Sequence, residues 1–257
     1  EIVLKLGEVA AATAPFPQSA TVSLDERIEI TSDSVFERVT PEELWAWMGR
    51  YEEKTGGRLL AIPHNGNLSN GRMFELTAFD GSPLDRDYAE RRTRWERLQE
   101  IVQTKGNSET HPTLSPNDEF AGDMGIAGWE YGNLTLEDEP ESPEMRPTMY
   151  LRSGLLRGLE QAAALGVNPF QFGFVGSTDV HNSLTAIEED DFFGKLPIQE
   201  PSPERWEHVV IKSTLDDSLT TLGWQQAASG RTAVWATENT REAIFDAMVR
   251  KETYATT

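Results

Sequence analysis

The chain of 257 residues carries a formal net charge of −20, with 38% hydrophobic residues and no cysteine. The absence of cysteine excludes disulfides, thiolate metal sites and thiol nucleophiles, so any bound metal must take nitrogen and oxygen ligands. The acidic balance argues against nucleic acid and anionic membranes as partners, because both need a basic surface. No apolar run is long enough to cross a bilayer, so the sequence predicts no membrane-spanning segment.

The chain divides into an N-terminal stretch and one larger region. Residues 1–39 contain two strand-like runs around an Ala- and Pro-rich linker and stay unassigned. Because Glu1 is neither an initiator Met nor part of a signal-peptide pattern, we expect a fragment or a processed form. Residues 40–257 are expected to form one domain with two acidic excursions, 113–146 and 184–222.

The first helix–strand unit of this domain has clear local signals. Thr40 and Glu43 form a capping box, and apolar residues at helical spacing follow until Gly56. A short buried strand is predicted over 59–62, and Pro63 ends it.

The pattern then recurs along the chain. A charged helix over 87–97 precedes a strand over 98–103, and a long helix over 147–165 precedes a strand over 171–175. We expect the long helix to bury one face, formed by Leu151, Leu155, Leu156 and Leu159 with Ala162 and Ala163. A last helix is predicted over 240–251. Alternating helices and buried strands indicate an α/β fold, either a mainly parallel sheet or a barrel.

Three of the four histidines follow strand-like runs, where the loops of α/β folds gather their chemistry. Asp179 and His181 stand two residues apart, so in an extended segment both could hold one cation. The alternative is an Asx-turn organised by Asp179, with His181 at the surface. His64 is either a ligand for Zn, Mn or Fe or a histidine satisfied by a backbone carbonyl.

Further polar residues lie on and after the strand over 98–103. Glu100 points either into an interior, where a carboxylate needs a partner or metal, or towards solvent. Lys105 could bind an anionic substrate and His111 could be a ligand or general acid, although an ordinary polar loop explains both. For Arg152 a phosphate contact is conceivable, but surface ion pairing is the commoner outcome. The sequence has no phosphate-binding Gly-rich loop and no Gly-x-Ser-x-Gly motif.

At these residues the chain resembles a bacterial domain-of-unknown-function family of the PHP superfamily, named for polymerase and histidinol phosphatase. The resemblance covers about residues 40–257 and involves ordered motifs at 59–71, 100–112, 115–120, 176–182 and 235–241. It implies a distorted (β/α)7 TIM-like barrel with two or three divalent metal ions at the carboxyl ends of its strands. It also implies a bacterial hydrolase, most often of phosphate esters, with a small anionic molecule as substrate. The absence of cysteine is compatible with both the cytoplasm and the periplasm, so the sequence leaves the compartment open.

The resemblance also suggests which residues take part. His64 matches the superfamily's Pro-His metal ligand, Asp179 and His181 match a late Asp-x-His ligand pair, and Glu100 matches an acidic strand position at the site. Lys105 and His111 match a loop of this family without assigned roles. No histidine precedes His64, so the superfamily's early His-x-His ligands have no counterpart and the barrel would lack its N-terminal portion.

Two alternatives to a phosphoesterase therefore stay open. One is a non-catalytic barrel fragment that binds a metal ion or another ligand. The other is a hydrolase of carbon–nitrogen or carbon–oxygen bonds with the same metal chemistry, since a fold alone does not decide the substrate.

Overall fold

The computed structural model describes residues 40–104, 106–121, 142–181, 202–212, 217, 220–225 and 230–256. The N-terminal stretch 1–39, Lys105 and parts of both acidic excursions lie outside the described residues. In chain order the helices and strands are α1 Pro41–Thr55, η3 Gly66–Leu68, α2 Arg86–Trp95, β1 Leu98–Gln103, β2 Gly106–Asn107, η5 Pro143–Thr148, α3 Leu151–Leu165, β3 Gly173–Gly176, η8 Arg205–Glu207, β4 Val209–Ile211, β5 Thr221–Leu222, η10 Gly223–Gln225, β6 Arg231–Val234, α4 Arg241–Val249 and β7 Thr253–Thr256.

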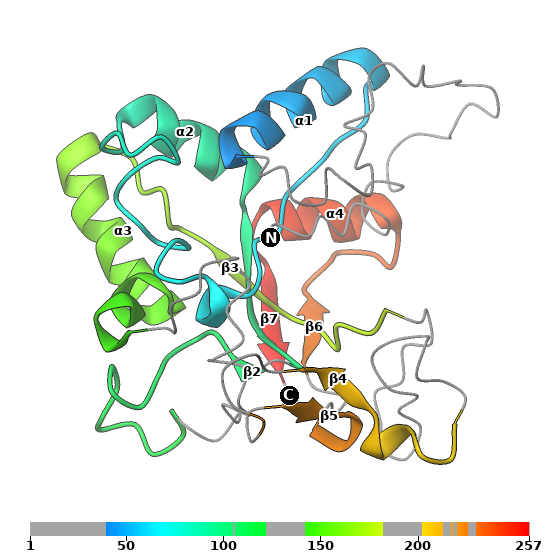
Figure 1. The fold of residues 1–257 in the computed structure, drawn as a ribbon. Helices are drawn as coiled ribbons and strands as arrows, with labels where there is room; N and C mark the ends of the chain where they lie inside the picture. Colours follow the sequence, from blue (N-terminus) through cyan, green and yellow to red (C-terminus); the bar gives the residue numbers. More distant parts are fainter. Residues whose placement is uncertain are drawn as a thin grey trace.

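A small sheet lies at the centre of the fold (Figure 1). Strand β1 lies between β2, which is antiparallel to it, and β3, which is parallel. The segment that ends at Pro63 continues the sheet beside β1, because Ala61 bridges Glu96 in parallel and the Glu100 amide donates to the Pro63 carbonyl. On the other side, the antiparallel pair β6 and β7, which are connected in the chain through α4, lies against β3. There the Thr253 hydroxyl donates to the Phe174 carbonyl at 2.8 Å.

The alternation of side chains along these strands separates two hydrophobic cores. One face of the sheet contributes Ile101 and Phe174 to a core with α1, α2 and α3, in which Trp45 and Phe170 are fully buried. The other face packs against α4 through a cluster of Leu60, Leu98, Val175, Phe245 and Met248. The central strands are therefore covered on both faces.

The prediction of a TIM-like (β/α)7 barrel is wrong. In the part of the chain that the structure describes, the strands form one three-stranded and two two-stranded sheets, and no closed barrel. The predicted strand over 59–62 reduces to a single bridge at Ala61, so the sheet ends after a short parallel core instead of curling into a ring. No helix in the described residues is both long enough and apolar enough to cross a membrane.

The local signals placed the first helix correctly. The Thr40 side chain accepts from the Glu43 amide at 3.2 Å, and the Glu43 carboxylate accepts from the Thr40 amide at 2.8 Å. Gly56, with φ at 67°, ends α1 in the left-handed conformation that glycine adopts without strain. The last helix is likewise capped, because the Thr240 hydroxyl accepts from the Ala243 amide at 3.3 Å.

The predicted buried face of the long helix is confirmed for Leu151, which is buried, and for Leu155, which packs against the core, but it is wrong for two other leucines. Leu156 and Leu159 are 64% and 63% exposed, whereas Gly154 and Gly158 are buried. Helix α3 also begins at Leu151 rather than at Pro147, which lies in the preceding 3-10 helix η5. Because glycine has no side chain, Gly154 and Gly158 let α3 approach its neighbours closely, and they form part of its packed face. The sequence pattern had predicted leucines at this face.

This close approach predicts opposite effects for two Gly-to-Ala changes. A Cβ on Gly154 would lie 2.7 Å from the Phe74 ring, so we expect Gly154→Ala to lower the free energy of unfolding by about 1–2 kcal/mol despite the better helix propensity of Ala. Gly49 in α1 has its nearest neighbour at 3.7 Å, so the control Gly49→Ala should stabilise by about 0.5–1 kcal/mol. Urea denaturation of both variants measures this, and stabilisation by Gly154→Ala would contradict the close packing.

Candidate functional site

The carboxyl ends of three chain segments meet at one edge of the central sheet, which we call the carboxyl edge. Strands β1 and β3 run parallel, and the segment ending at Pro63 runs parallel to β1 on its other side. His64 follows the first segment, Gln103 ends β1, and Ser177 follows β3. The structure thus brings the predicted residues His64, Glu100 and the 179–181 pair to neighbouring segments of one edge.

A buried carboxylate–hydroxyl contact connects two of these segments. Glu100 lies inside β1 and is 5% exposed, on the same face as Leu98. The Ser177 hydroxyl donates to Glu100 Oε2 at 2.8 Å, and the Ser177 amide donates to the Val102 carbonyl at 3.0 Å. Both contacts fix the start of the loop that carries Asp179, so Glu100 is an interior carboxylate and not a solvent-facing one.

Asp179 and His181 contact each other directly. His181 Nε2 lies 3.1 Å from Asp179 Oδ1, and the two side chains are 40% and 13% exposed. The backbone of Asp179 has φ at 53°, the left-handed region that Asp and Asn tolerate better than other non-Gly residues. The turn therefore brings an imidazole nitrogen and a carboxylate oxygen into direct contact, with the imidazole accessible to solvent.

A layer of amides and a hydroxyl supports the segment after His64. Gln103, 1% exposed, donates from Nε2 to Asn65 Oδ1 at 3.0 Å. The Ser108 hydroxyl donates to Asn67 Oδ1 at 2.8 Å. Asn65 has φ at 62°, so both loops at the carboxyl edge leave their segments through a left-handed residue. Buried amides in this layer hold the His64 loop against β1 without adding charge.

His111 is held by its own loop. It is 7% exposed, its Nδ1 accepts from the Thr113 amide at 3.1 Å, and its ring lies 5.6 Å from that of Tyr150. Burial lowers the pKa of His111, and the positive charge of Arg146 lowers it further. Since Nδ1 accepts a hydrogen bond, the neutral ring carries its proton on Nε2, which suits a hydrogen-bond donor better than a metal ligand.

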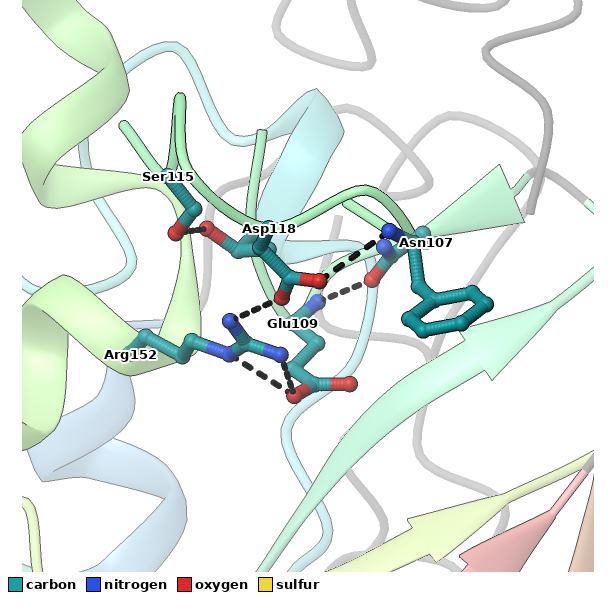
Figure 2. A network of polar contacts seen from close by, with 7 residues as sticks. Asn107, Glu109, Ser115, Asp118 and Arg152 are labelled. Carbon is teal, nitrogen blue, oxygen red and sulfur yellow. Dashed lines mark hydrogen bonds and ion pairs between the residues drawn. The ribbon is translucent and has the colours of Figure 1, made fainter. Parts of the chain in front are cut away.

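The loop after β2 is fastened to α3 by Arg152 (Figure 2). Arg152 Nε donates to Glu109 Oε1 at 2.8 Å, and Nη1 donates to Asp118 Oδ2 at 2.6 Å. These hydrogen bonds and charges lower the pKa of Asp118 and raise that of Arg152. The Asn107 side chain accepts from the Glu109 amide at 2.5 Å. Ion pairing is thus confirmed for Arg152, whose guanidinium pairs with the carboxylates of Glu109 and Asp118.

The donor set at the carboxyl edge fits a divalent ion in part. Asp179 and His181 supply one oxygen and one nitrogen, the ligand types that Zn, Mn and Fe take in the absence of thiolates. Among the described residues, however, no group of three or more His, Asp or Glu side chains lies close enough together to hold a metal. Lys105, a predicted substrate-binding residue, lies outside the described residues.

Sequence reasoning missed Ser177, Asn65 and Gln103. Each is a common polar residue whose partner lies far away along the chain, so no local pattern identifies it. For Ser177, the one available signal was its place directly after a buried strand and two residues before Asp179.

Comparisons with known proteins give one result. No curated protein and no solved structure matches this chain. A family model described as "Protein of unknown function (DUF3604)" matches residues 21–257. That description assigns no activity and does not mention the PHP superfamily, so the relationship to that superfamily stays a prediction. The chain belongs to the DUF3604 family of proteins of unknown function.

Proposed function

We propose that this chain is a metal-dependent hydrolase of phosphoesters, with its reaction centre at the carboxyl edge. The supporting observation is that His64, Glu100 and the Asp179–His181 pair lie on neighbouring parallel segments of one sheet. Carboxylates and imidazoles collected from separate strands are the usual construction of hydrolytic sites in α/β proteins. The resemblance of the motifs around these residues to the PHP superfamily supports the phosphoester as substrate class.

In this proposal Asp179 and His181 would hold a divalent ion, and His64 on the adjacent segment would be a further ligand. The ion would supply Lewis-acid chemistry by neutralising the charge that develops on phosphoryl oxygens. Glu100 accepts a proton from the attacking water, and the Ser177 hydroxyl at 2.8 Å orients its carboxylate. The buried Gln103–Asn65 contact keeps the His64 loop in place for this role.

The second candidate is a binding protein without turnover. The described residues supply only the Asp179–His181 pair as adjacent ligands and no third one, which favours this alternative. Hydrolysis of a carbon–nitrogen or carbon–oxygen bond would use the same ligands and differs only in substrate. A measurement of metal binding distinguishes the two hydrolase proposals from a protein without a metal site. A measurement of substrate turnover distinguishes them from a protein that only binds its ligand.

Metal content per chain, measured by inductively coupled plasma mass spectrometry after purification without chelator, tests the ligand assignment. We expect at least one equivalent of Zn, Mn or Fe in the wild type and a loss of most of it in the double variant Asp179→Asn/His181→Gln. The matched control His208→Gln removes a histidine that lies next to β4 and should keep the metal. Equal metal in the wild type and the double variant would overturn the assignment.

A further inference from the structure

The amino ends of the same strands carry two cations that have no acidic partner among the described residues. Arg97 directly precedes β1 and Lys251 lies just before β7. The Gly173 amide donates to the Arg97 carbonyl at 2.9 Å, and a Cβ on Gly173 would lie 2.8 Å from Lys251 Cβ. The two residues therefore flank Gly173, the first residue of β3, at the end of the sheet opposite the carboxyl edge. We call this end the amino edge.

The nearby carboxylates are occupied by other arginines. Asp246 pairs with Arg58 at 2.6 Å and Glu252 pairs with Arg250 at 2.7 Å, both on the chain segment that carries Lys251. Near the end of α2, Arg94 pairs with Glu52 at 3.1 Å. In a chain with a net charge of −20, two adjacent cations that form no ion pair with any described residue are unusual.

Both cations sit in positions that are unfavourable without a ligand. Arg97 Nε is buried and has no hydrogen-bond acceptor in the part of the chain that the structure describes. No hydrogen bond from these residues therefore compensates this polar group for its lost hydration. Burial lowers the pKa of Lys251, and the positive charge of Arg97 lowers it further. An anion between them would relieve both effects.

The backbone of Lys251 gives a further indication. The Glu252 amide donates to the Ala247 carbonyl and the Lys251 amide to the Met248 carbonyl, which is the Schellman arrangement at the end of α4. Lys251 occupies the left-handed position of this motif with φ at 66°, where glycine is the usual residue. Lys251 thus occupies a backbone position whose left-handed conformation favours glycine over a residue with a side chain.

We propose that Arg97 and Lys251 bind a small oxyanion, either free phosphate or the phosphoryl group of a small molecule, at the amino edge. This site is separate from the proposed hydrolytic site and does not depend on it. Arg97 provides a planar guanidinium suited to two oxygens, and Lys251 provides a point charge. Its position beside the first residue of β3 means that the anion would stabilise the sheet that carries the carboxyl edge.

Phosphate titrations of the 257-residue chain, at ionic strength held constant with chloride, test this proposal. Isothermal titration calorimetry and the melting temperature should show phosphate binding to the wild type, with affinity at least about tenfold weaker in Arg97→Gln and in Lys251→Gly. The matched control Arg50→Gln removes an exposed arginine of α1 and should bind as the wild type does. Tighter binding of an alkyl phosphonate would indicate a phosphorylated metabolite, and tighter binding of phosphate would indicate the free ion.

The Lys251→Gly variant has a second readout. Without phosphate we expect its melting temperature to rise by about 2–4 °C, because glycine relieves the left-handed backbone and one of two like charges is removed. If the only role of Lys251 is a favourable interaction of its charge with the helix dipole at the end of α4, the melting temperature of the variant should instead fall. No phosphate-dependent shift in the wild type, or equal shifts in the wild type and both variants, would overturn the proposal.

Discussion

Glu96→Gln is expected to lower the free energy of unfolding by about 3–5 kcal/mol, because it leaves a buried guanidinium without its counter-charge. Arg92 Nε lies 2.7 Å from Glu96 Oε2, and the two side chains are 8% and 6% exposed. The Trp45 indole donates to Glu96 Oε1 at 3.1 Å, and Arg92 lies 4.8 Å from the centre of the Phe170 ring. This ion pair therefore connects α1, α2 and the segment before β3 inside one core.

The same helix offers a matched control. Arg86 and Glu90 have the same i, i+4 spacing, with Nε 2.8 Å from Oε1, but their side chains are 63% and 51% exposed. Because solvent screens exposed pairs, Glu90→Gln should change the free energy of unfolding by less than about 0.5 kcal/mol. Urea denaturation followed by Trp fluorescence measures both variants. Similar small effects for the two changes would show that the buried pair contributes no more than a surface pair.

Glu100→Gln is expected to lower kcat for a phosphoester substrate by about 10²–10⁴-fold, the range that general acid–base catalysis supplies. The amide keeps the size of the side chain and can still accept from the Ser177 hydroxyl, but it cannot take a proton from water. Metal content and melting temperature should stay close to those of the wild type, which separates loss of a base from loss of the fold.

The control for this change is Ser177→Ala, which retains the carboxylate and removes the 2.8 Å contact that orients it. We expect a smaller loss of about tenfold, in keeping with one misoriented hydrogen bond. Unchanged kcat in Glu100→Gln would remove this residue from the reaction.

The helices were predictable where local chemistry determines them. The capping box at Thr40 and Glu43 and the N-cap at Thr240 satisfy backbone amides within a few residues, so the sequence around them is sufficient. The packed face of α3 was not predictable in this way. This face packs through the close approach of Gly154 to the ring of Phe74. Because the two residues are far apart in the sequence, the spacing of leucines along the helix does not predict their contact.

The barrel was predicted from resemblance and is not present in the described residues. Alternating helices and strands specify parallel neighbours, and β1 and β3 are indeed parallel, but closure depends on strand number and tilt. For the site, the sequence pattern places His64 and Asp179 after strand-like runs and Glu100 within a strand, and the structure has these three residues on neighbouring segments, while their roles stay predictions. The contacts that orient them, from Ser177 and Gln103, required the register between segments that are distant in sequence.

The most direct test is the initial rate of hydrolysis of a panel of phosphomonoesters and phosphodiesters, measured with and without a chelator. We predict turnover that is lost with the chelator, restored by Mn or Zn, and absent in Asp179→Asn/His181→Gln. Hydrolysis that resists the chelator, or that persists in the double variant, would contradict a metal-dependent reaction centre at the carboxyl edge. So would metal-loaded protein that hydrolyses none of these esters.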